Sequence, residues 1–64
     1  MRLWLKLIRK EAQLTQGAVA KNCGISTQFY SYIENAERQP SVKVAKKIGK
    51  MLGFDWTLFF ETDD

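Results

Sequence analysis

Four neutral, hydrogen-bonding side chains lie close together in the middle of the sequence, at positions 27, 28, 31 and 32. This spacing puts them on one face of a helix. An ordinary solvated helix face mixes Lys and Glu, whereas this face is uncharged. A glutamine amide can bind adenine with two hydrogen bonds, and hydroxyl groups can bind bases or phosphates. The residues predicted to contact DNA bases are Thr27, Gln28, Ser31 and Tyr32.

Catalytic and metal-binding chemistry lacks the residues it needs. The sequence contains no histidine and one cysteine, Cys23. It therefore cannot supply the ligands of a structural zinc site, and a single cysteine cannot form an internal disulfide. No pair of carboxylates suggests a catalytic pocket, so we expect no enzyme, no metal and no cofactor. We interpret Cys23 as a packing residue rather than a reactive thiol.

The charge of the chain is unevenly distributed. The formal net charge is +3, from ten basic and seven acidic residues. All ten basic and three acidic residues precede Asp55, which gives this part a net charge of +7. The rest of the chain carries four acids and no base, a net charge of −4. A basic body indicates a polyanionic partner, and the alternative is an ordinary charged surface.

The hydrophobic pattern is helical along the whole chain, and the 64 residues are expected to form one compact all-α domain, residues 1–64. Thr15, Ser26 and Asp55 are expected N-caps, and glycines are expected at helix ends. Five short helices are predicted, over residues 2–12, 16 to 22 or 23, 27–35, from 40 or 41 to 52, and 56 to 60 or 61.

The second and third helices are joined by about three residues around Gly24. So short a connection forces a steep crossing, as in a helix-turn-helix, here over about residues 16–35. Gly24 suits a helix end in a left-handed turn, and Ala20 is small enough for a close crossing. Because any corner between two helices needs such residues, the corner alone leaves DNA binding and simple packing open.

A set of residues with a specific joint spacing runs from Ile8 to Leu52. In this set the sequence resembles the phage repressor/Cro-like family, also called XRE-type helix-turn-helix domains. The resemblance covers essentially the whole chain and implies a five-helix, lambda-repressor-like fold. The matching residues are Ile8-Arg9, Leu14-Thr15-Gln16, Ala20, Gly24-Ile25-Ser26, Ile33-Glu34-Asn35, Arg38, Pro40-Ser41, Ile48 and Leu52.

The resemblance also implies roles for individual residues. The third helix would lie in the major groove, with base contacts at the four neutral polar positions. Gln16 would touch the DNA backbone and buttress this helix, and a salt bridge between Arg9 and Glu34 would tie the first helix to the third. Further contacts to the DNA backbone would come from Asn35, Arg38, Ser41 and Lys43.

Several positions depart from the family pattern, among them Cys23, where a leucine-like residue is common, and Leu58, where a polar residue is usual. Gly17 replaces the usual long side chain after the glutamine, which removes a possible phosphate contact and loosens the helix start by ~1 kcal/mol. Together with Tyr32, Phe29 makes the third helix unusually aromatic. Its ring has two readings that the sequence leaves open: contact with a thymine methyl group, or packing on a neighbour.

Large apolar residues crowd the C-terminal stretch, residues 54–61. Either their side chains complete a thin core, or some stay exposed as an interface. We expect a symmetric dimer through this segment, with half-sites roughly 34 Å apart on DNA. The expected interface residues are Trp56, Leu58, Phe59 and Phe60.

These features predict a sequence-specific DNA-binding transcriptional regulator that represses by covering a promoter as a homodimer. The alternative is a protein-interaction module, such as an antitoxin, whose main partner is a toxin or antirepressor and whose DNA binding is secondary. No stretch approaches the ~20 apolar residues of a membrane span, and no signal peptide is expected. We therefore expect a cytoplasmic, nucleoid-associated protein of a bacterium or phage.

Overall fold

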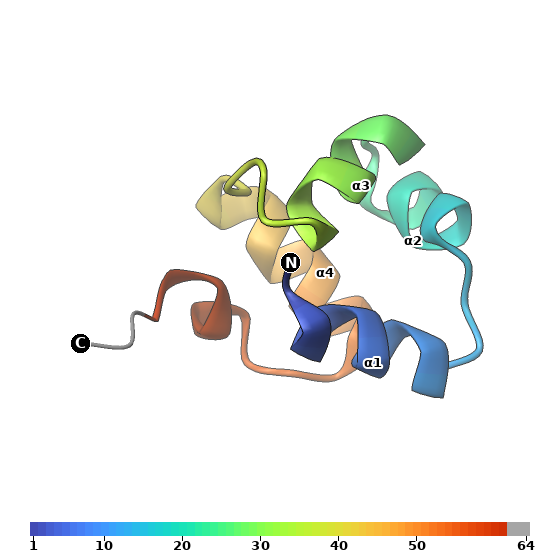
Figure 1. Cartoon of the computed structure of the whole chain (residues 1–64), viewed down its shortest axis with the longest axis horizontal. Helices are drawn as coiled ribbons and strands as arrows, with labels where there is room; N and C mark the ends of the chain where they lie inside the picture. The colour runs from blue at the N-terminus through green and yellow to red at the C-terminus, as the bar shows by residue number, and fades with distance from the viewer. Residues whose placement is uncertain (62–64) are drawn as a thin grey trace.

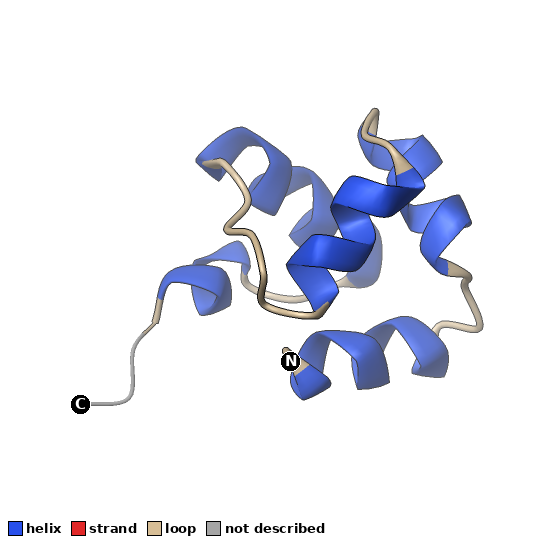
Figure 2. Cartoon of the chain, turned by 45° about the horizontal axis from the view of Figure 1, so that its top comes forward, coloured by secondary structure: helices blue, strands red, loops and turns tan. Residues whose placement is uncertain are grey.

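The computed structural model describes residues 1–61. They form four α-helices and one 3₁₀-helix, and contain no strand (Figure 2). The predicted all-α class is confirmed, except that the fifth helix is a 3₁₀-helix. Thr62, Asp63 and Asp64, the end of the predicted domain and of its acidic tail, lie outside the described residues. The elements are α1 (Leu3–Glu11), α2 (Gln16–Cys23), α3 (Thr27–Glu34), α4 (Val42–Leu52) and η1 (Trp56–Phe60).

Short polar side chains start four of the five elements. Thr15, Ser26, Ser41 and Asp55 are the N-caps of α2, α3, α4 and η1. Each side-chain oxygen accepts a hydrogen bond of 3.0–3.2 Å from the backbone N–H two or three residues further on. These bonds satisfy N–H groups that a helix start otherwise leaves without a partner. The predicted caps Thr15, Ser26 and Asp55 are therefore confirmed. Ser41 was expected inside the opening of the fourth helix, at residue 40 or 41, and is instead its N-cap, so that α4 begins at Val42.

The ends of α1 and α3 differ from the predicted ends. α1 begins at Leu3 rather than Arg2, which is its N-cap but makes no side-chain cap bond. α3 ends at Glu34, with Asn35 as its C-cap. The next residue, Ala36, has φ 63°, a left-handed conformation that stops the helix.

α4 lies between two parts of the molecule. It packs against α2 on one side and η1 on the other (Figure 1). α3 packs against α2 and also against α1. The two helices of the predicted corner, α2 and α3, are thus supported from behind by α1 and α4, which leaves one long side of α3 outside the core.

The core is small and contains residues from every element. An aromatic cluster joins its two ends: the rings of Trp4, Phe54 and Phe59 lie 5.2–5.6 Å apart, centroid to centroid. Such edge-on and tilted contacts add to the burial of each ring. The buried apolar residues are Leu5, Val19, Ala20, Cys23, Tyr30, Ile33, Ala45, Ile48 and Phe59.

Two glycines fold the C-terminal segment back onto α4. Gly53 ends α4 with φ 79°, a conformation that favours glycine. Gly49 lies where the returning chain comes closest, because a Cβ added there would be 2.8 Å from the Phe54 carbonyl oxygen. The close approach of backbone to helix is what brings Phe59 into the core.

Candidate nucleic-acid interface

The corner between α2 and α3 determines the direction of α3. Gly24 ends α2 with φ 72°, and the Ile25 N–H donates to the Ala20 carbonyl oxygen at 3.0 Å. Ala20 is buried, as a close crossing requires. Gly17, at the start of α2, lies near Thr27, since a Cβ added to Gly17 would be 3.6 Å from Thr27 Oγ1. The first turns of α2 and α3 therefore lie close together in space.

α3 has an inner face that packs in the core and an outer face at the surface. Tyr30, Ile33 and Glu34 are its buried residues and fix its inner face. Phe29 is partly buried and packs against the core, while contact of its exposed part with a thymine methyl group remains a prediction. On the outer face, Thr27, Gln28, Ser31 and Tyr32 are either exposed or half-buried.

The carboxylate of Glu34 joins three helices. Arg9 donates to it through Nε at 2.8 Å and through Nη2 at 3.0 Å, and the Gln16 amide donates at 3.1 Å. Arg9 also donates to the Leu14 carbonyl oxygen at 2.8 Å. The arrangement holds the end of α3 against α1 and the start of α2, and it uses the Gln16 amide as a buttress. Contact between Gln16 and the DNA backbone remains a prediction.

The electrostatics of this cluster follow from its burial. Burial alone disfavours the charged form of Glu34, but the hydrogen bonds from Arg9 and Gln16 outweigh it, so the pKa of Glu34 lies below its ordinary value. The bond to Glu34 raises the pKa of Arg9. Burial raises the pKa of the neighbouring Tyr30 hydroxyl. The cluster is therefore a buried ion pair rather than an acid or base poised for reaction.

Four of the five side chains expected at the DNA backbone are exposed, whereas Gln16 is half-buried. These four lie on the loop after α3 and at the start of α4, which follow one another along the chain. Arg38 reaches back to α3, with its guanidinium 5.8 Å from the centre of the Tyr32 ring. Ser41 is occupied as the cap of α4. The four residues are Asn35, Arg38, Ser41 and Lys43.

Sequence reasoning missed two residues that hold this loop. The Arg2 guanidinium donates to the carbonyl oxygens of Ile33 and Arg38 and to the Gln39 side chain. The Gln39 amide donates in turn to the Phe59 carbonyl oxygen at 2.8 Å. The loop is thus attached both to the N-terminus and to η1. Most of these partners are backbone carbonyls, which leave no signal in the sequence.

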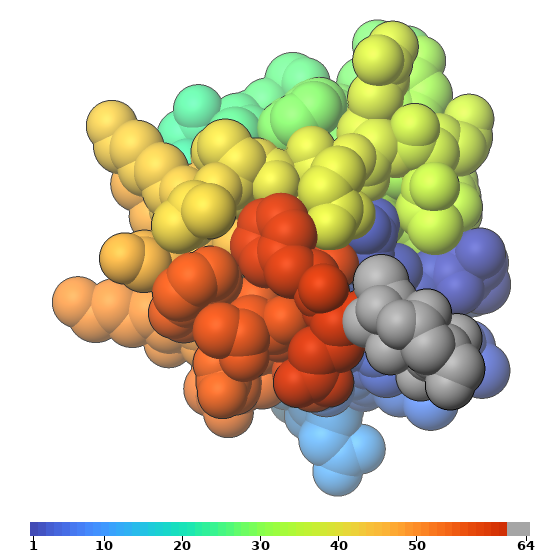
Figure 3. Space-filling model, turned by 90° about the vertical axis from the view of Figure 1, so that its left-hand side faces the viewer, coloured from blue at the N-terminus to red at the C-terminus, as the bar shows by residue number. Residues whose placement is uncertain are grey.

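The expected interface residues of the tail divide into two groups. Phe59 is 4% exposed and lies in the core, which corrects its prediction as an interface residue. Its burial follows from the return of the chain at Gly53. Leu58 and Phe60 are each 38% exposed, and Trp56 is half-buried with Lys46 Nζ 5.2 Å from its ring centre. In Figure 3, η1 lies at the surface between the N-terminal segment and the loop after α3.

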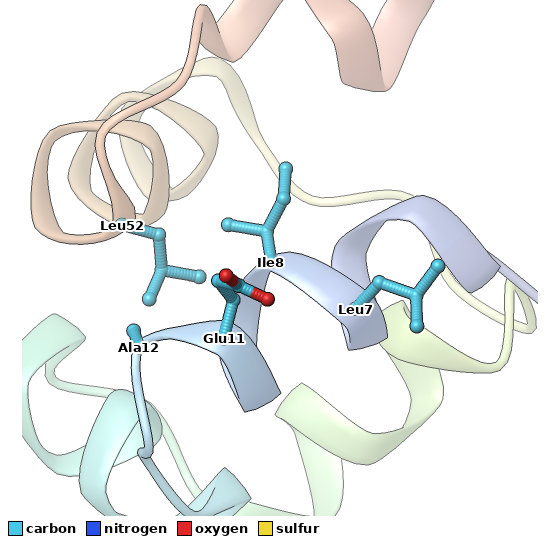
Figure 4. A pocket seen from close by; sticks show the side chains of 5 residues that line it. All are labelled: Leu7, Ile8, Glu11, Ala12 and Leu52. Atoms are coloured by element: carbon cyan, nitrogen blue, oxygen red, sulfur yellow. The ribbon is translucent and has the colours of Figure 1, made fainter.

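A hollow beside α1 and the buried cysteine were candidates for a second site within residues 1–61. Leu7, Ile8, Glu11, Ala12 and Leu52 line a hollow of about 370 Å³ between α1 and the end of α4, with Leu7 turned away from Leu52 (Figure 4). One of these five side chains, Glu11, is titratable. Cys23 is 2% exposed, and burial raises the pKa of its thiol. Within residues 1–61, no three His, Cys, Asp or Glu residues gather into a group that could hold a metal ion.

Comparison with known proteins identifies this architecture. A helix-turn-helix family model (HTH_3) matches residues 5–59. The chain belongs to this XRE-type helix-turn-helix family. The helix-turn-helix protein is 57% identical over 61 residues to YqaF, an uncharacterised HTH-type transcriptional regulator of Bacillus subtilis. The match spans 95% of this chain and 80% of that protein.

A more distant relative has the same description. The helix-turn-helix protein is 43% identical over 49 residues to an uncharacterised HTH-type transcriptional regulator of Methanocaldococcus jannaschii, a match that spans 77% of this chain and 74% of that protein. No solved structure matches it. The predicted family is thus confirmed, and it is a family of DNA-binding transcriptional regulators. Each helix within residues 1–61 is too short or too polar to cross a membrane.

Proposed function

We propose that this protein is a sequence-specific transcriptional repressor that binds operator DNA as a homodimer and covers a promoter. The observation that carries the proposal is the uncharged, polar outer face of α3, whose inner face is fixed by Tyr30, Ile33 and Glu34. Such a helix can enter the major groove without disturbing its own core. The residues proposed to contact bases are Thr27, Gln28, Ser31 and Tyr32.

The DNA backbone is proposed to be held around this helix. The starts of α2 and α3 lie close together, and exposed helix N-termini attract phosphate groups. Phosphate contacts fix the position of the protein on the duplex but carry no sequence information. The residues proposed for these contacts are Gln16, Asn35, Arg38, Ser41 and Lys43. A DNA partner implies that the protein acts in the cytoplasm at the nucleoid.

The dimer is proposed to form through η1. Leu58 and Phe60 expose apolar surface next to the half-buried ring of Trp56, and the rings of Trp56 and Phe60 lie 6.0 Å apart. A two-fold axis through this segment would present two copies of α3 to half-sites roughly 34 Å apart. The support is the exposed apolar surface, since Phe59 belongs to the core.

Selection of bound sequences from random duplex DNA tests the proposed function. The expected product is a two-fold symmetric site, bound at least ~10³-fold more tightly than unrelated DNA. Binding with the same affinity to every sequence would contradict sequence-specific regulation. Sedimentation at micromolar concentration, with and without the selected site, tests the dimer. A monomer under both conditions would contradict it.

A protein partner is the second candidate function, and one observation favours it. Leu3 and Leu7, one turn apart on α1, are 55% and 56% exposed, an apolar surface separate from η1. Exposed apolar surface of this kind marks interaction sites. A toxin or antirepressor bound there would make DNA binding secondary. Purification at native expression level tests this, because a partner would appear as a second protein in stoichiometric amount.

A further inference from the structure

Two of the four polar side chains on the outer face of α3 are bonded to each other. The Gln28 amide, through Nε2, donates a hydrogen bond of 2.8 Å to the Tyr32 hydroxyl oxygen. The two residues are one helical turn apart, so the bond runs along the face that is proposed to meet the bases. A hydrogen bond between two side chains proposed to contact bases indicates that the two do not bind DNA independently.

The Tyr32 ring is held in place from a second direction. The Arg38 guanidinium lies over it, 5.8 Å from the ring centre. The backbone N–H groups of Glu37 and Arg38 donate to the Tyr32 carbonyl oxygen at 2.8 and 3.2 Å. The loop after α3 is therefore fixed against Tyr32. A shallow hollow of about 230 Å³ lies here, lined by Ser26, Gln28, Phe29, Tyr32 and Arg38.

The bond leaves the Gln28 amide with a defined pair of remaining groups. Its nitrogen carries two hydrogens, and Tyr32 takes one of them. When Tyr32 takes the hydrogen trans to Oε1, the other hydrogen and Oε1 form a donor and an acceptor side by side, which match N7 and the N6 amino group of adenine. A free glutamine would have to give up rotamer freedom on binding, and the bond to Tyr32 removes part of that freedom beforehand.

We propose that Tyr32 is a positioning residue for base recognition: its hydroxyl holds the Gln28 amide in the orientation that binds adenine. Tyr32 itself then reads no base, so this role replaces the base contact that the sequence and the proposed function gave to Tyr32. This assignment rests on the proposed function, because it requires α3 to lie in the major groove.

Tyr32→Phe is the test, because it removes the hydroxyl and keeps the ring under Arg38. Selection from random DNA identifies the base pair whose preference Gln28→Ala relaxes, by roughly 5- to 150-fold. Tyr32→Phe should relax preference at that same base pair, by about 2- to 10-fold, the range of one hydrogen bond. The double variant should then lose no more than Gln28→Ala alone. Ser31→Ala is the matched control, since it removes a hydroxyl from the same face, and it should leave that base pair unchanged.

Several results would overturn the assignment. Relaxation at a different base pair, with additive effects in the double variant, would make Tyr32 a base reader. An equal loss on all sequences would make it a backbone or structural residue. If the wild-type protein shows no sequence preference, the proposed function fails, and the positioning role fails with it. Selection with the wild-type protein alone gives this result, so it is distinguishable from a failure of the positioning role in the variants.

A measurement without DNA separates the two proposals. In NMR spectra of the free protein, Tyr32→Phe should shift the Gln28 side-chain NH₂ resonances and lower their order parameter, whereas Ser31→Ala should not. Unchanged Gln28 resonances would show that the hydroxyl does not hold the amide, whatever the protein binds. A shift together with unspecific DNA binding would mean that the bond exists but serves no base recognition, which also overturns the role.

Discussion

Glu34 shows at the scale of single residues what the sequence can and cannot predict. Its pairing with Arg9 was expected from a family pattern, and the structure places their charged groups 2.8 Å apart. The hydrogen bonds of Arg2 have no comparable signal in the sequence, because Arg2 binds mainly backbone carbonyl groups, which every residue possesses. Polar side chains that bind each other are thus easier to predict than those that bind the main chain.

The buried ion pair predicts how stability depends on pH. The pKa of Glu34 is lower in the folded chain than its ordinary value of 4.5, so the folded state binds fewer protons in acid than the unfolded state. The free energy of unfolding should therefore be constant at neutral pH and fall from about pH 5 downwards. Urea unfolding between pH 7 and pH 3 measures this dependence.

Glu34→Gln should remove most of that dependence and cost about 3 kcal/mol at pH 7, because Arg9 keeps a buried charge without its partner. The control is Glu37→Gln, an exposed residue of the loop, which should change neither value. A Glu34→Gln variant with the stability and acid response of the wild-type protein would show that the pair contributes nothing to folding.

Lys43 is predicted to touch a DNA phosphate from the first turn of α4. Lys43→Ala should lower the slope of log affinity against log salt concentration by about one, because one fewer counterion is released. Fluorescence anisotropy over a salt series measures the slope. Lys50→Ala, in the last turn of the same helix, is the control and should leave the slope unchanged. Equal slopes for all three proteins would make Lys43 an ordinary surface residue.

At the scale of elements, local chemistry explains what was predictable. The starts of α2, α3 and η1 were predicted because each cap bonds to its own helix two or three residues away. The nature and position of η1 could not be predicted in this way. They depend on the close contact between the returning chain and Gly49, a glycine inside α4 for which the sequence predicts no role. That contact buries Phe59.

Gly49 and Gly17 predict opposite effects of the same substitution. Gly49→Ala should destabilise the fold by about 1–3 kcal/mol, because its Cβ would lie 2.8 Å from a backbone oxygen that cannot move without shifting η1. Gly17→Ala should stabilise it by about 0.5 kcal/mol, because its Cβ meets nothing closer than 3.6 Å and alanine favours a helix. Thermal unfolding of both variants measures this. Equal stability of the two would contradict the close contact at Gly49.

At the scale of the whole molecule, the proposed DNA surface and the proposed dimer surface lie on different sides of α4 (Figure 1). The loop after α3 connects them, because Gln39 binds the Phe59 carbonyl oxygen while Arg38 contacts Tyr32. Helix-turn-helix membership was predictable from spacing. The division of the tail into buried and exposed side chains was not predictable from the sequence. Four of the five residues 56–60 are large and apolar, and only the direction of each side chain in η1 decides which of them is buried.

The exposed part of the tail predicts how the dimer can be separated from the fold. The double variant Leu58→Asp, Phe60→Asp should abolish self-association and lower affinity for the full operator while the chain still unfolds cooperatively, because neither side chain belongs to the buried core. Sedimentation and binding to full and half operators measure this. Leu7→Asp is the control on α1, 56% exposed, and should leave the dimer intact. Self-association lost in the control but kept in the double variant would move the interface to α1.

The two faces of α3 share no residue, and this has an evolutionary consequence. Stability depends on the buried residues Tyr30, Ile33 and Glu34. The proposed recognition of the DNA sequence depends on the outward positions 27, 28, 31 and 32. A descendant could therefore acquire a new target by exchanging outward residues without passing through an unfolded intermediate. The Gln28–Tyr32 bond limits this freedom, because these two positions would have to change together.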